Sequence, residues 1–314
     1  MEKKATRESY GEALEKLGEE NSNIVVLDSD LSGATKTDLF AKKFPNRFFD
    51  MGIAEANMMS TAAGLATCGK IPYASTFAVF AAGRAYDQIR NSICYPKMNV
   101  KICATHSGIT VGEDGATHQM LEDISMMRSL PNMTVLSPSD DAQTKWIIRE
   151  ISKIEGPVYV RLARLATEKI YNEDEARNFE IGKAYQFGDG TDGTVFATGV
   201  TVKEALKAKE ILKNQGINIR VIDMFTIKPI DEEIIIKSAK ETKKMISIED
   251  HNIIGGLGSA ISEVLTDKYP KELTRLGIRD TFGKSGKAEA LMKYYGICAE
   301  NIIGIFDGFL GTCS

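Results

Sequence analysis

Cysteine, histidine and tryptophan are scarce in this sequence of 314 residues, which contains five, three and one of them respectively. The five cysteines form no CxxC pair and no metal-binding spacing, so we expect reduced thiols, as in a cytoplasmic protein, and no disulfide framework. No run of 18 apolar residues occurs, so the sequence predicts no membrane-spanning helix. The first residues lack the apolar core of a signal peptide, so no secretory leader is expected.

An excess of positive charge is also missing. The chain carries 39 basic and 43 acidic residues, for a net charge of −4, so it lacks the basic footprint of a nucleic-acid-binding protein. With 43% hydrophobic and 26% charged residues, its composition is that of a globular protein. The length predicts about two domains of roughly 150 residues each.

One apolar stretch organises the first half of the chain. A short strand ends at Asp50, Gly52 permits a turn, and a helix is expected over residues 54–68, closing at Gly69. Few charged residues follow its first turn, so we expect this helix to be buried on most sides. Glu55 at its start has two interpretations. It is either a solvated acid stabilised by the helix dipole, or a buried carboxyl with a raised pKa that shares a proton with a ligand nitrogen.

Short apolar strands alternate with helices through about residue 162, a pattern that predicts a parallel α/β sheet with helices on both faces. A polar stretch with an acidic run at residues 173–175 follows, and a second α/β unit then begins. We therefore expect two domains, each a mostly parallel sheet covered by helices, at residues 1–170 and 193–314, with a linker at 171–192.

Several polar side chains follow the predicted strands of the first domain. In parallel α/β sheets, ligands bind beyond the carboxyl ends of the strands, so these side chains are expected at one functional edge. They are Asp30, Glu55, His106, Asp114, His118 and Arg164.

Two histidines lie 12 residues apart in a loop rich in glycine, threonine and aspartate. His106 and His118 can donate to sugar hydroxyls or move a proton near neutral pH, with Asp114 accepting a further hydroxyl. The alternative is a pair of ordinary surface-loop histidines. No HxH or HExxH spacing occurs, so no metal site is expected in this chain.

Two further pairs have both a structural and a functional interpretation. Phe77 and Phe80 lie on one face if the following helix starts early, either as core residues or as the wall of an apolar pocket. Arg161 and Arg164 end a strand, where one of them can bind an anion through two hydrogen bonds or serve only the structure.

These motifs together resemble the C-terminal half of the transketolase family, over nearly the whole chain. The resemblance is carried by residues 52–58, by residues 75–80, by His106 with residues 112–119, and by residues 249–252. It implies the pyrimidine-binding domain and the C-terminal domain of a family whose full-length members have three α/β domains.

The third domain of the family, which binds the diphosphate, is not covered by the resemblance, and a partner chain is therefore expected to supply it. The resemblance implies the C-terminal subunit of a split transketolase, acting in the pentose phosphate pathway and transferring a two-carbon ketol unit from a ketose phosphate to an aldose phosphate. A separate N-terminal subunit would supply the diphosphate-binding domain and the Mg²⁺ ligands for thiamine diphosphate. Because the active sites of this family form between subunits, an α2β2 assembly is expected.

The resemblance also implies residue roles, with Glu55 hydrogen-bonded to N1′ of the cofactor's aminopyrimidine and Phe80 stacked on that ring. The cofactor contacts are Asp30, Leu31, Ile53, Glu55, Phe77 and Phe80. The sugar phosphate contacts are His106, Asp114, His118, Arg164 and Arg7. The catalytic residues are Glu55, His106 and His118.

Some positions depart from the family pattern. Ala54 and Asn57 replace an arginine and a histidine that flank the glutamate in full-length enzymes, Gly83 replaces a tyrosine, and Ala34 replaces a phosphate-binding serine. These changes concern the choice of phosphosugar rather than the cofactor. A deoxyxylulose-phosphate-synthase-like half, another thiamine diphosphate enzyme half-subunit and a non-catalytic partner subunit stay open as alternatives; the substrate loop of pyruvate dehydrogenase beta subunits is not seen.

Overall fold

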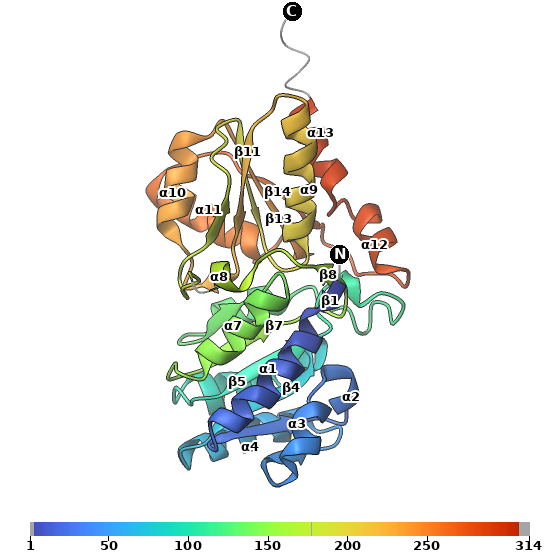
Figure 1. Ribbon diagram of the computed structural model, residues 1–314, viewed down its shortest axis with the longest axis vertical. Helices are drawn as coiled ribbons and strands as arrows, with labels where there is room; N and C mark the ends of the chain where they lie inside the picture. The colour runs from blue at the N-terminus through green and yellow to red at the C-terminus, as the bar shows by residue number, and fades with distance from the viewer. Residues whose placement is uncertain (1–2, 177, 308–314) are drawn as a thin grey trace, which may run out of the picture.

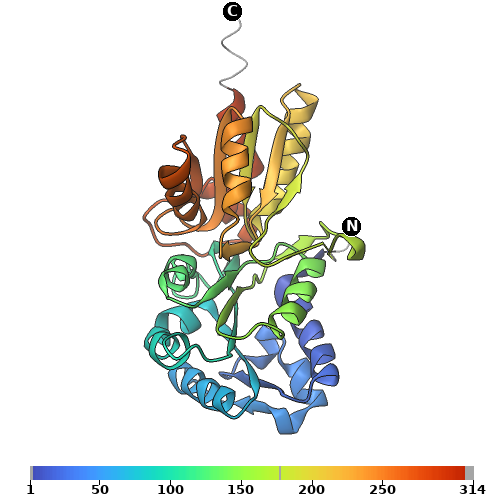
Figure 2. The same ribbon diagram turned by 90° about the vertical axis from the view of Figure 1, so that its left-hand side faces the viewer.

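The computed structural model describes residues 3–176 and 178–307. Two sheet-centred halves follow one another along the long axis of the molecule, the first drawn in blue to green and the second in yellow to red (Figure 1). Turning the molecule by 90° shows helices on both faces of the first sheet (Figure 2). Helices α1 (Thr6–Glu20) and α7 (Asp141–Ile151) lie on one side, and α4 (Glu55–Thr67) lies on the other.

The first half contains a seven-stranded sheet in the order β12-β6-β7-β5-β4-β2-β3. Its first six strands along the chain are parallel to one another, which confirms the predicted parallel α/β sheet. They are β2 (Ile24–Asp28), β3 (Phe48–Asp50), β4 (Ile71–Phe77), β5 (Lys101–Thr105), β6 (Thr134–Leu136) and β7 (Val158–Arg161). The seventh, β12 (Thr226–Lys228), comes from the second half of the chain and pairs antiparallel with β6.

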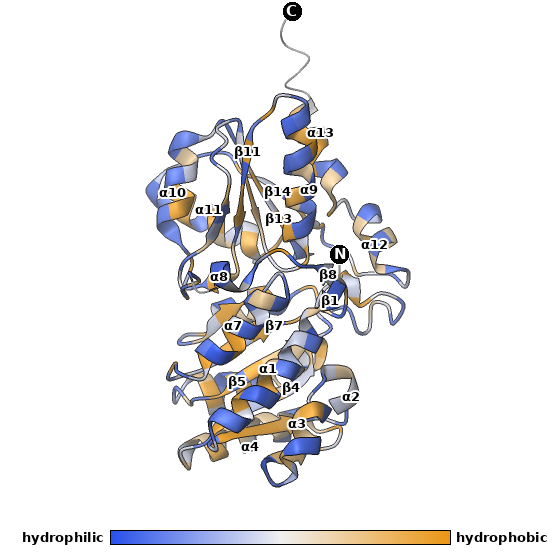
Figure 3. Ribbon diagram, in the orientation of Figure 1, coloured by the Kyte–Doolittle hydropathy of each residue, from blue (hydrophilic) through white to orange (hydrophobic). Residues whose placement is uncertain are grey.

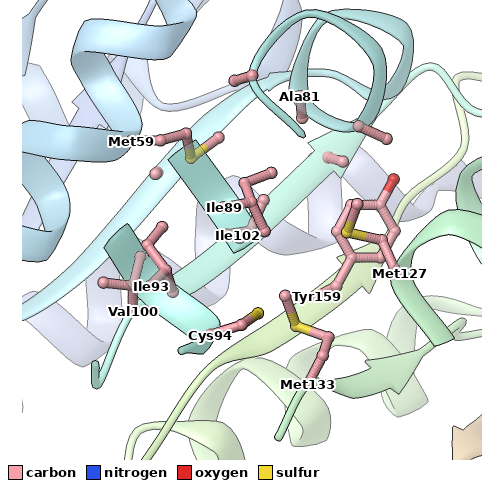
Figure 4. Packing of buried hydrophobic residues seen from close by; sticks show 14 of the residues in the cluster. Met59, Ala81, Ile89, Ile93, Cys94, Val100, Ile102, Met127, Met133 and Tyr159 are labelled. Carbon is pink, nitrogen blue, oxygen red and sulfur yellow. The ribbon is translucent and has the colours of Figure 1, made fainter. Parts of the chain in front are cut away.

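Successive residues of β2 face opposite layers, as the period of a strand requires. Ile24 and Val26 pack into a core under α1 and α7, while Val25 and Leu27 pack into a core under α4. Figure 3 shows apolar strands between helices whose outer faces are polar. Figure 4 shows the α4-side core, to which Met127 and Tyr159 both belong.

The first half contains helices and short helical turns between its strands. They are α1 (Thr6–Glu20), α2 (Ser32–Thr35), α3 (Asp38–Lys43), a 3₁₀ turn (Pro45–Arg47), α4 (Glu55–Thr67), a π-helical turn (Val79–Arg84), α5 (Tyr86–Gln88), a second π-helical turn (Ile89–Cys94), a 3₁₀ turn (Ile109–Val111), α6 (Asp123–Ser129) and α7 (Asp141–Ile151).

Helix α4 begins and ends close to the predicted bounds, and Gly69 adopts a positive φ of 76° after it. The expectation that it is buried on most sides is wrong for this chain. Asn57, Ser60, Gly64 and Thr67 form an exposed stripe along the helix. Small, uncharged side chains therefore face outward, although the opposite face packs into the core.

The second half contains a five-stranded sheet in the order β14-β13-β10-β11-β9. Its strands are β9 (Tyr185–Phe187), β10 (Gly193–Ala197), β11 (Ile219–Asp223), β13 (Lys244–Asn252) and β14 (Thr274–Ile278), of which only β9 is antiparallel to its neighbour. Its helices are α9 (Thr201–Asn214), α10 (Glu232–Glu241), α11 (Leu257–Lys268), α12 (Ala288–Tyr294) and α13 (Ala299–Asp307).

The segment that joins the two halves has regular structure of its own. The stretch 171–192, predicted as a linker, includes α8 (Glu173–Ala176) and β9, so it contributes an edge strand to the second sheet. Before it, β8 (Ala166–Glu168) pairs antiparallel with β1 (Lys3–Ala5). Within the described residues, no helix is both long and apolar enough to cross a membrane.

Candidate functional site

The carboxyl ends of five neighbouring parallel strands place most of the predicted site residues along one sheet edge. In the spatial order β7, β5, β4, β2 and β3, the segments that follow these strands carry Arg164, His106, Phe80, Asp30 and Glu55. Phe77 is the last residue of β4. The placement agrees with the sequence prediction, because parallel strands all end at the same edge.

Glu55 starts helix α4, and only 2% of its surface is exposed. Its two carboxylate oxygens each lie 2.8 Å from Nη1 of Arg84, which therefore donates to the carboxylate. The interpretation of Glu55 as a solvated first-turn acid is wrong, because the carboxyl lies in the interior. The same guanidinium lies over the ring of Phe80, with Cζ 4.4 Å from the ring centroid.

Four rings form a cluster beside this ion pair. Phe77 and Phe80 stack with centroids 5.9 Å apart and an interplanar angle of 9°. His106 stacks on Phe77 at 3.8 Å, and His118 meets Phe80 edge-on at 5.6 Å. The two rings thus stack as the pair was expected to, but they do not share a helix face, because Phe77 ends β4 and only Phe80 lies in the helical turn. A π-helical turn, a feature that often marks functional sites, carries both Phe80 and Arg84.

His106 is almost completely buried and adopts a positive φ of 56°. Burial, with the positive charges of Arg7 and Arg164 nearby, lowers the pKa of His106 to about 3. The imidazole is therefore neutral near pH 7. Because a guanidinium only donates, Nη1 of Arg7 at 3.5 Å makes Nε2 of His106 the acceptor. The proton then lies on Nδ1, which donates to the Thr105 hydroxyl at 2.9 Å.

Two arginines lie near His106, and a third belongs to the core. Nη1 of Arg164 donates to the Val111 carbonyl at 2.6 Å and lies 3.4 Å from the Asp114 carboxylate. Nη1 of Arg7 donates to the Ala34 carbonyl at 2.9 Å, while its buried Nε has no hydrogen-bond partner. Arg161 is buried and pairs with Asp123, with Nε 2.9 Å from Oδ2, so it is structural.

Asp30, Leu31 and Ile53 lie in the loops that follow β2 and β3, and we call these three residues the rim of the site. Asp30 is exposed, and the exposed fraction of Ile53 is 76%. Asp50 connects their loops, because its Oδ1 accepts the N–H of Asp30 at 3.0 Å and the N–H of Gly52 at 2.9 Å.

A second acid, the buried Asp28, holds the start of the loop that carries Asp30 and Leu31. Its Oδ1 accepts the N–H of Leu31 at 2.7 Å, and its Oδ2 accepts the hydroxyls of Thr35 and Thr37. Burial raises the pKa of Asp28 to about 6, against the effect of these hydrogen bonds. The rim loop is therefore held by a buried carboxyl with three donors.

Sequence reasoning missed Arg84, Asp50 and Asp28 as members of this site. Arg84 carried a usable signal, since it follows Phe80 by four residues and so lies on the same helical face. Both aspartates end short apolar strands, at the position where backbone N–H groups of a following turn need an acceptor. Within the described residues, no group of three or more His, Cys, Asp or Glu side chains is arranged to hold a metal ion.

The groups at the centre of the site indicate which kind of ligand could bind there. A planar cation with N–H groups already lies on the Phe80 face and donates to the buried carboxylate of Glu55. A planar nitrogen heterocycle that stacks on the same ring and offers a protonated nitrogen would satisfy the same two partners.

Comparison with known proteins agrees with this geometry. Residues 2–169 match the family described as "Transketolase, pyrimidine binding domain", and residues 182–302 match "Transketolase, C-terminal domain". The chain is 56% identical over 300 residues to a protein of Methanocaldococcus jannaschii named "Putative transketolase C-terminal section", with 95% of this chain and 94% of that protein covered.

A second relative and a solved structure extend the comparison. The chain is 41% identical to the "6-deoxy-6-sulfo-D-fructose transketolase subunit SqwH" of a Clostridium species, covering 96% of this chain and 94% of that protein. The solved structure is titled "Split gene transketolase, inactive beta4 tetramer". It superposes with a TM-score of 0.90 at 51% identity, covering 97% of this chain and 98% of that one.

Proposed function

We infer the function of this chain from the family to which it belongs, the transketolases, of which it forms a C-terminal section. The proposed activity is the transfer of a two-carbon ketol unit from a ketose phosphate to an aldose phosphate, with thiamine diphosphate and Mg²⁺, in a complex with an N-terminal subunit. The observation that carries this proposal is the buried Glu55 carboxylate, which faces a planar N–H donor on the Phe80 ring.

The residues present fit the aminopyrimidine of thiamine diphosphate. Glu55 would hold a proton at the pyrimidine nitrogen N1′, and its burial strengthens that hydrogen bond because the local dielectric is low. Phe80 would stack on the ring, while Phe77 would keep water away from it. When bound, the cofactor supplies a carbon nucleophile that no side chain provides.

The sugar would lie beside the histidines. Neutral His106 offers the Nε2 lone pair to a sugar hydroxyl proton, at the price of its contact with Arg7. His118 and Asp114 lie on the same loop and would hold further hydroxyls. Both guanidinium groups lie close enough to His106 for their positive charges to oppose its protonation. At the same place, Arg164 and Arg7 would bind the phosphate.

The remaining part of the site is proposed to come from the N-terminal subunit, which would bind the diphosphate through Mg²⁺. The exposed rim of Asp30 and Ile53 and the outward stripe on α4 supply the surface that such a subunit and a second copy would cover in an α2β2 complex. The related split transketolase described as an inactive beta4 tetramer supports both self-association and the need for a partner.

The identity of the donor sugar has one specific alternative. The sulfosugar transketolase subunit at 41% identity indicates that a sulfonate can stand where other members bind a phosphate. Both anions would meet Arg7 and Arg164. The pentose phosphate pathway is the metabolic role proposed for a phosphate donor, and the free thiols of Cys68, Cys94, Cys103 and Cys298 support a cytoplasmic location.

A coupled assay tests the proposal. Xylulose 5-phosphate and ribose 5-phosphate are given to this chain with and without the N-terminal subunit, in the presence of thiamine diphosphate and Mg²⁺. Activity is expected only with both subunits. Activity of this chain alone would contradict the division of the site. Activity of the pair only with a sulfosugar, or only with pyruvate and glyceraldehyde 3-phosphate, would replace the proposed donor.

A further inference from the structure

The loop that carries both site histidines is anchored by the second half of the chain. Asp250 lies in β13, and only 1% of its surface is exposed. Its Oδ1 accepts the N–H of Ile109 at 2.8 Å, and its Oδ2 accepts the N–H and the hydroxyl of Thr110 at 3.3 and 2.7 Å. One carboxylate thus satisfies the first free N–H groups of the 3₁₀ turn that begins three residues after His106.

The approach of the loop to Asp250 is close enough to require glycine. Gly108 adopts a φ of +74°, and a Cβ there would lie 2.1 Å from Oδ2 of Asp250. Asp250 is itself fixed from below, because Nη2 of Arg161 donates to its backbone carbonyl at 2.8 Å while Nε of Arg161 pairs with Asp123. The loop is therefore bound to a carboxylate whose own backbone is held by Arg161.

A second contact holds the other end of the same loop. The Nε2 of Gln119, next to His118, lies 3.2 Å from the carbonyl oxygens of Ile109 and Gly112 and 2.9 Å from that of Lys284, so these three acceptors share its two N–H donors. A Cβ on Gly115 would lie 2.4 Å from the hydroxyl of Ser285. Both ends of the loop are thus packed against the second half of the chain.

We propose that Asp250 is a positioning residue, which sets the placement of His106 and His118 for the sugar substrate from the other half of the chain. This inference rests on the proposed function only in naming the sugar as the ligand of the loop. The anchoring of the loop is a property of this chain alone, so it can be measured separately.

The test uses a matched control on the same strand. Glu249 precedes Asp250, is fully buried, and also accepts two backbone N–H groups, those of Leu257 and Gly258 at 2.6 and 2.9 Å. It caps α11 inside the second half. Asp250→Ala and Glu249→Ala therefore remove comparable buried acceptors, and only the first faces the histidine loop.

Hydrogen–deuterium exchange of the chain is the first measurement. Asp250→Ala is expected to speed exchange over residues 107–119, whereas Glu249→Ala is expected to speed it at the start of α11 and leave 107–119 unchanged. If Asp250→Ala does not fold, Thr110→Val against Thr110→Ser makes the same comparison, because only serine keeps the hydroxyl donated to Asp250. Wild-type exchange over 107–119 in Asp250→Ala, or in Thr110→Val, would overturn the proposal.

Kinetics of the reconstituted complex are the second measurement. Asp250→Ala is expected to lower kcat/KM for the ketose phosphate on the order of 10- to 100-fold, with the half-saturating concentration of thiamine diphosphate unchanged. Equal losses for sugar and cofactor, or the same losses in Glu249→Ala, would make Asp250 merely structural. Asp250→Ala could loosen the loop while the wild-type complex has no transketolase activity. That result would support the positioning role of Asp250 and contradict the proposed function.

Discussion

Arg84 lies between the two groups that define the centre of the site: it donates to both oxygens of Glu55 and covers the ring of Phe80. Half of the Arg84 side chain is exposed, at 49%, whereas the side chain of Glu55 is 2% exposed. The buried acid is thus neutralised by a partner that water can reach, but removal of that partner leaves a buried, unpaired carboxylate unless another N–H donor takes its place. This asymmetry separates what each residue is expected to do.

Replacing Glu55 tests its chemical role. In Glu55→Ala, transfer by the complex is expected to fall on the order of 100-fold or more, because the proton at the pyrimidine nitrogen loses its partner. Folding should survive, since the Arg84 left behind is half-exposed and can be hydrated. The coupled assay and a thermal melt measure the two effects. Glu232→Ala is the control, because Glu232 is also a first-turn acid paired with a basic side chain, in α10. Wild-type transfer in Glu55→Ala would refute the role.

Replacing Arg84 tests whether its guanidinium competes with the cofactor. In Arg84→Met, thiamine diphosphate is expected to reach half-saturation at a several-fold lower concentration, because the cofactor no longer competes with the guanidinium for the buried Glu55 carboxylate, which is left without a partner. Methionine keeps apolar contact with the Phe80 ring. Titration of the reconstituted complex with the cofactor measures the change. A higher half-saturating concentration would mean that Arg84 remains in the site and helps to bind the cofactor.

The depressed pKa of His106 predicts a stability effect in acid. The folded-state pKa is about 3, below the ordinary value of 6.5. Between these two values the unfolded chain binds the proton and the folded chain does not. The contribution is therefore fully present above pH 6.5 and is lost as the pH falls, by up to about 1.4 kcal/mol per pH unit.

Urea unfolding of wild type and His106→Gln between pH 7 and pH 4 isolates this contribution from other titrating groups, such as Glu249, whose pKa burial raises to about 7. The free energy of unfolding of the wild type is expected to fall more steeply toward low pH than that of the variant. Parallel curves for the two proteins would contradict a neutral, buried His106.

A buried carboxylate, Asp223, joins the two halves through three donors. Its Oδ2 accepts from the Ser139 hydroxyl at 2.8 Å, from Nε2 of Gln143 at 3.0 Å and from the Tyr171 hydroxyl at 2.7 Å. Tyr171→Phe is expected to lower the free energy of unfolding by about 1–3 kcal/mol, since the carboxylate loses a buried donor. The control is Tyr185→Phe, whose hydroxyl lies 3.4 Å from Glu175 in a half-buried place. Equal effects would show that the hydrogen bond to Asp223 contributes nothing specific.

The sequence predicts the parallel sheet and the side of it that carries the site, because both follow from local patterns. Strand and helix periods are visible within about ten residues, and parallel strands bring Glu55, His106 and Arg164 to one edge regardless of the details of packing. The three-residue spacing of Phe77 and Phe80 predicted a pair on one helix face, whereas the rings stack across the junction between β4 and the helical turn.

Contacts between segments far apart in the chain could not be predicted from the sequence. Glu55 is paired with Arg84, which lies 29 residues away, and the histidine loop is bound by Asp250, which lies about 140 residues away. The exposed stripe on α4 was missed for a related reason. An uncharged helix face predicts burial, but the sequence does not say whether the covering surface belongs to the same chain. The same holds for β9, a three-residue strand in a polar stretch whose partner is β11.

Strand β12 has a consequence for dividing the chain. It is coded in the second half and completes the edge of the first sheet beside β6. A fragment that stopped at residue 192 would keep every predicted site residue, yet it would leave the edge of β6 without its neighbour, open to pairing with another molecule. Recombination that exchanged the second half for an unrelated domain would carry the same penalty. The two halves are therefore expected to be inherited, expressed and engineered as one unit.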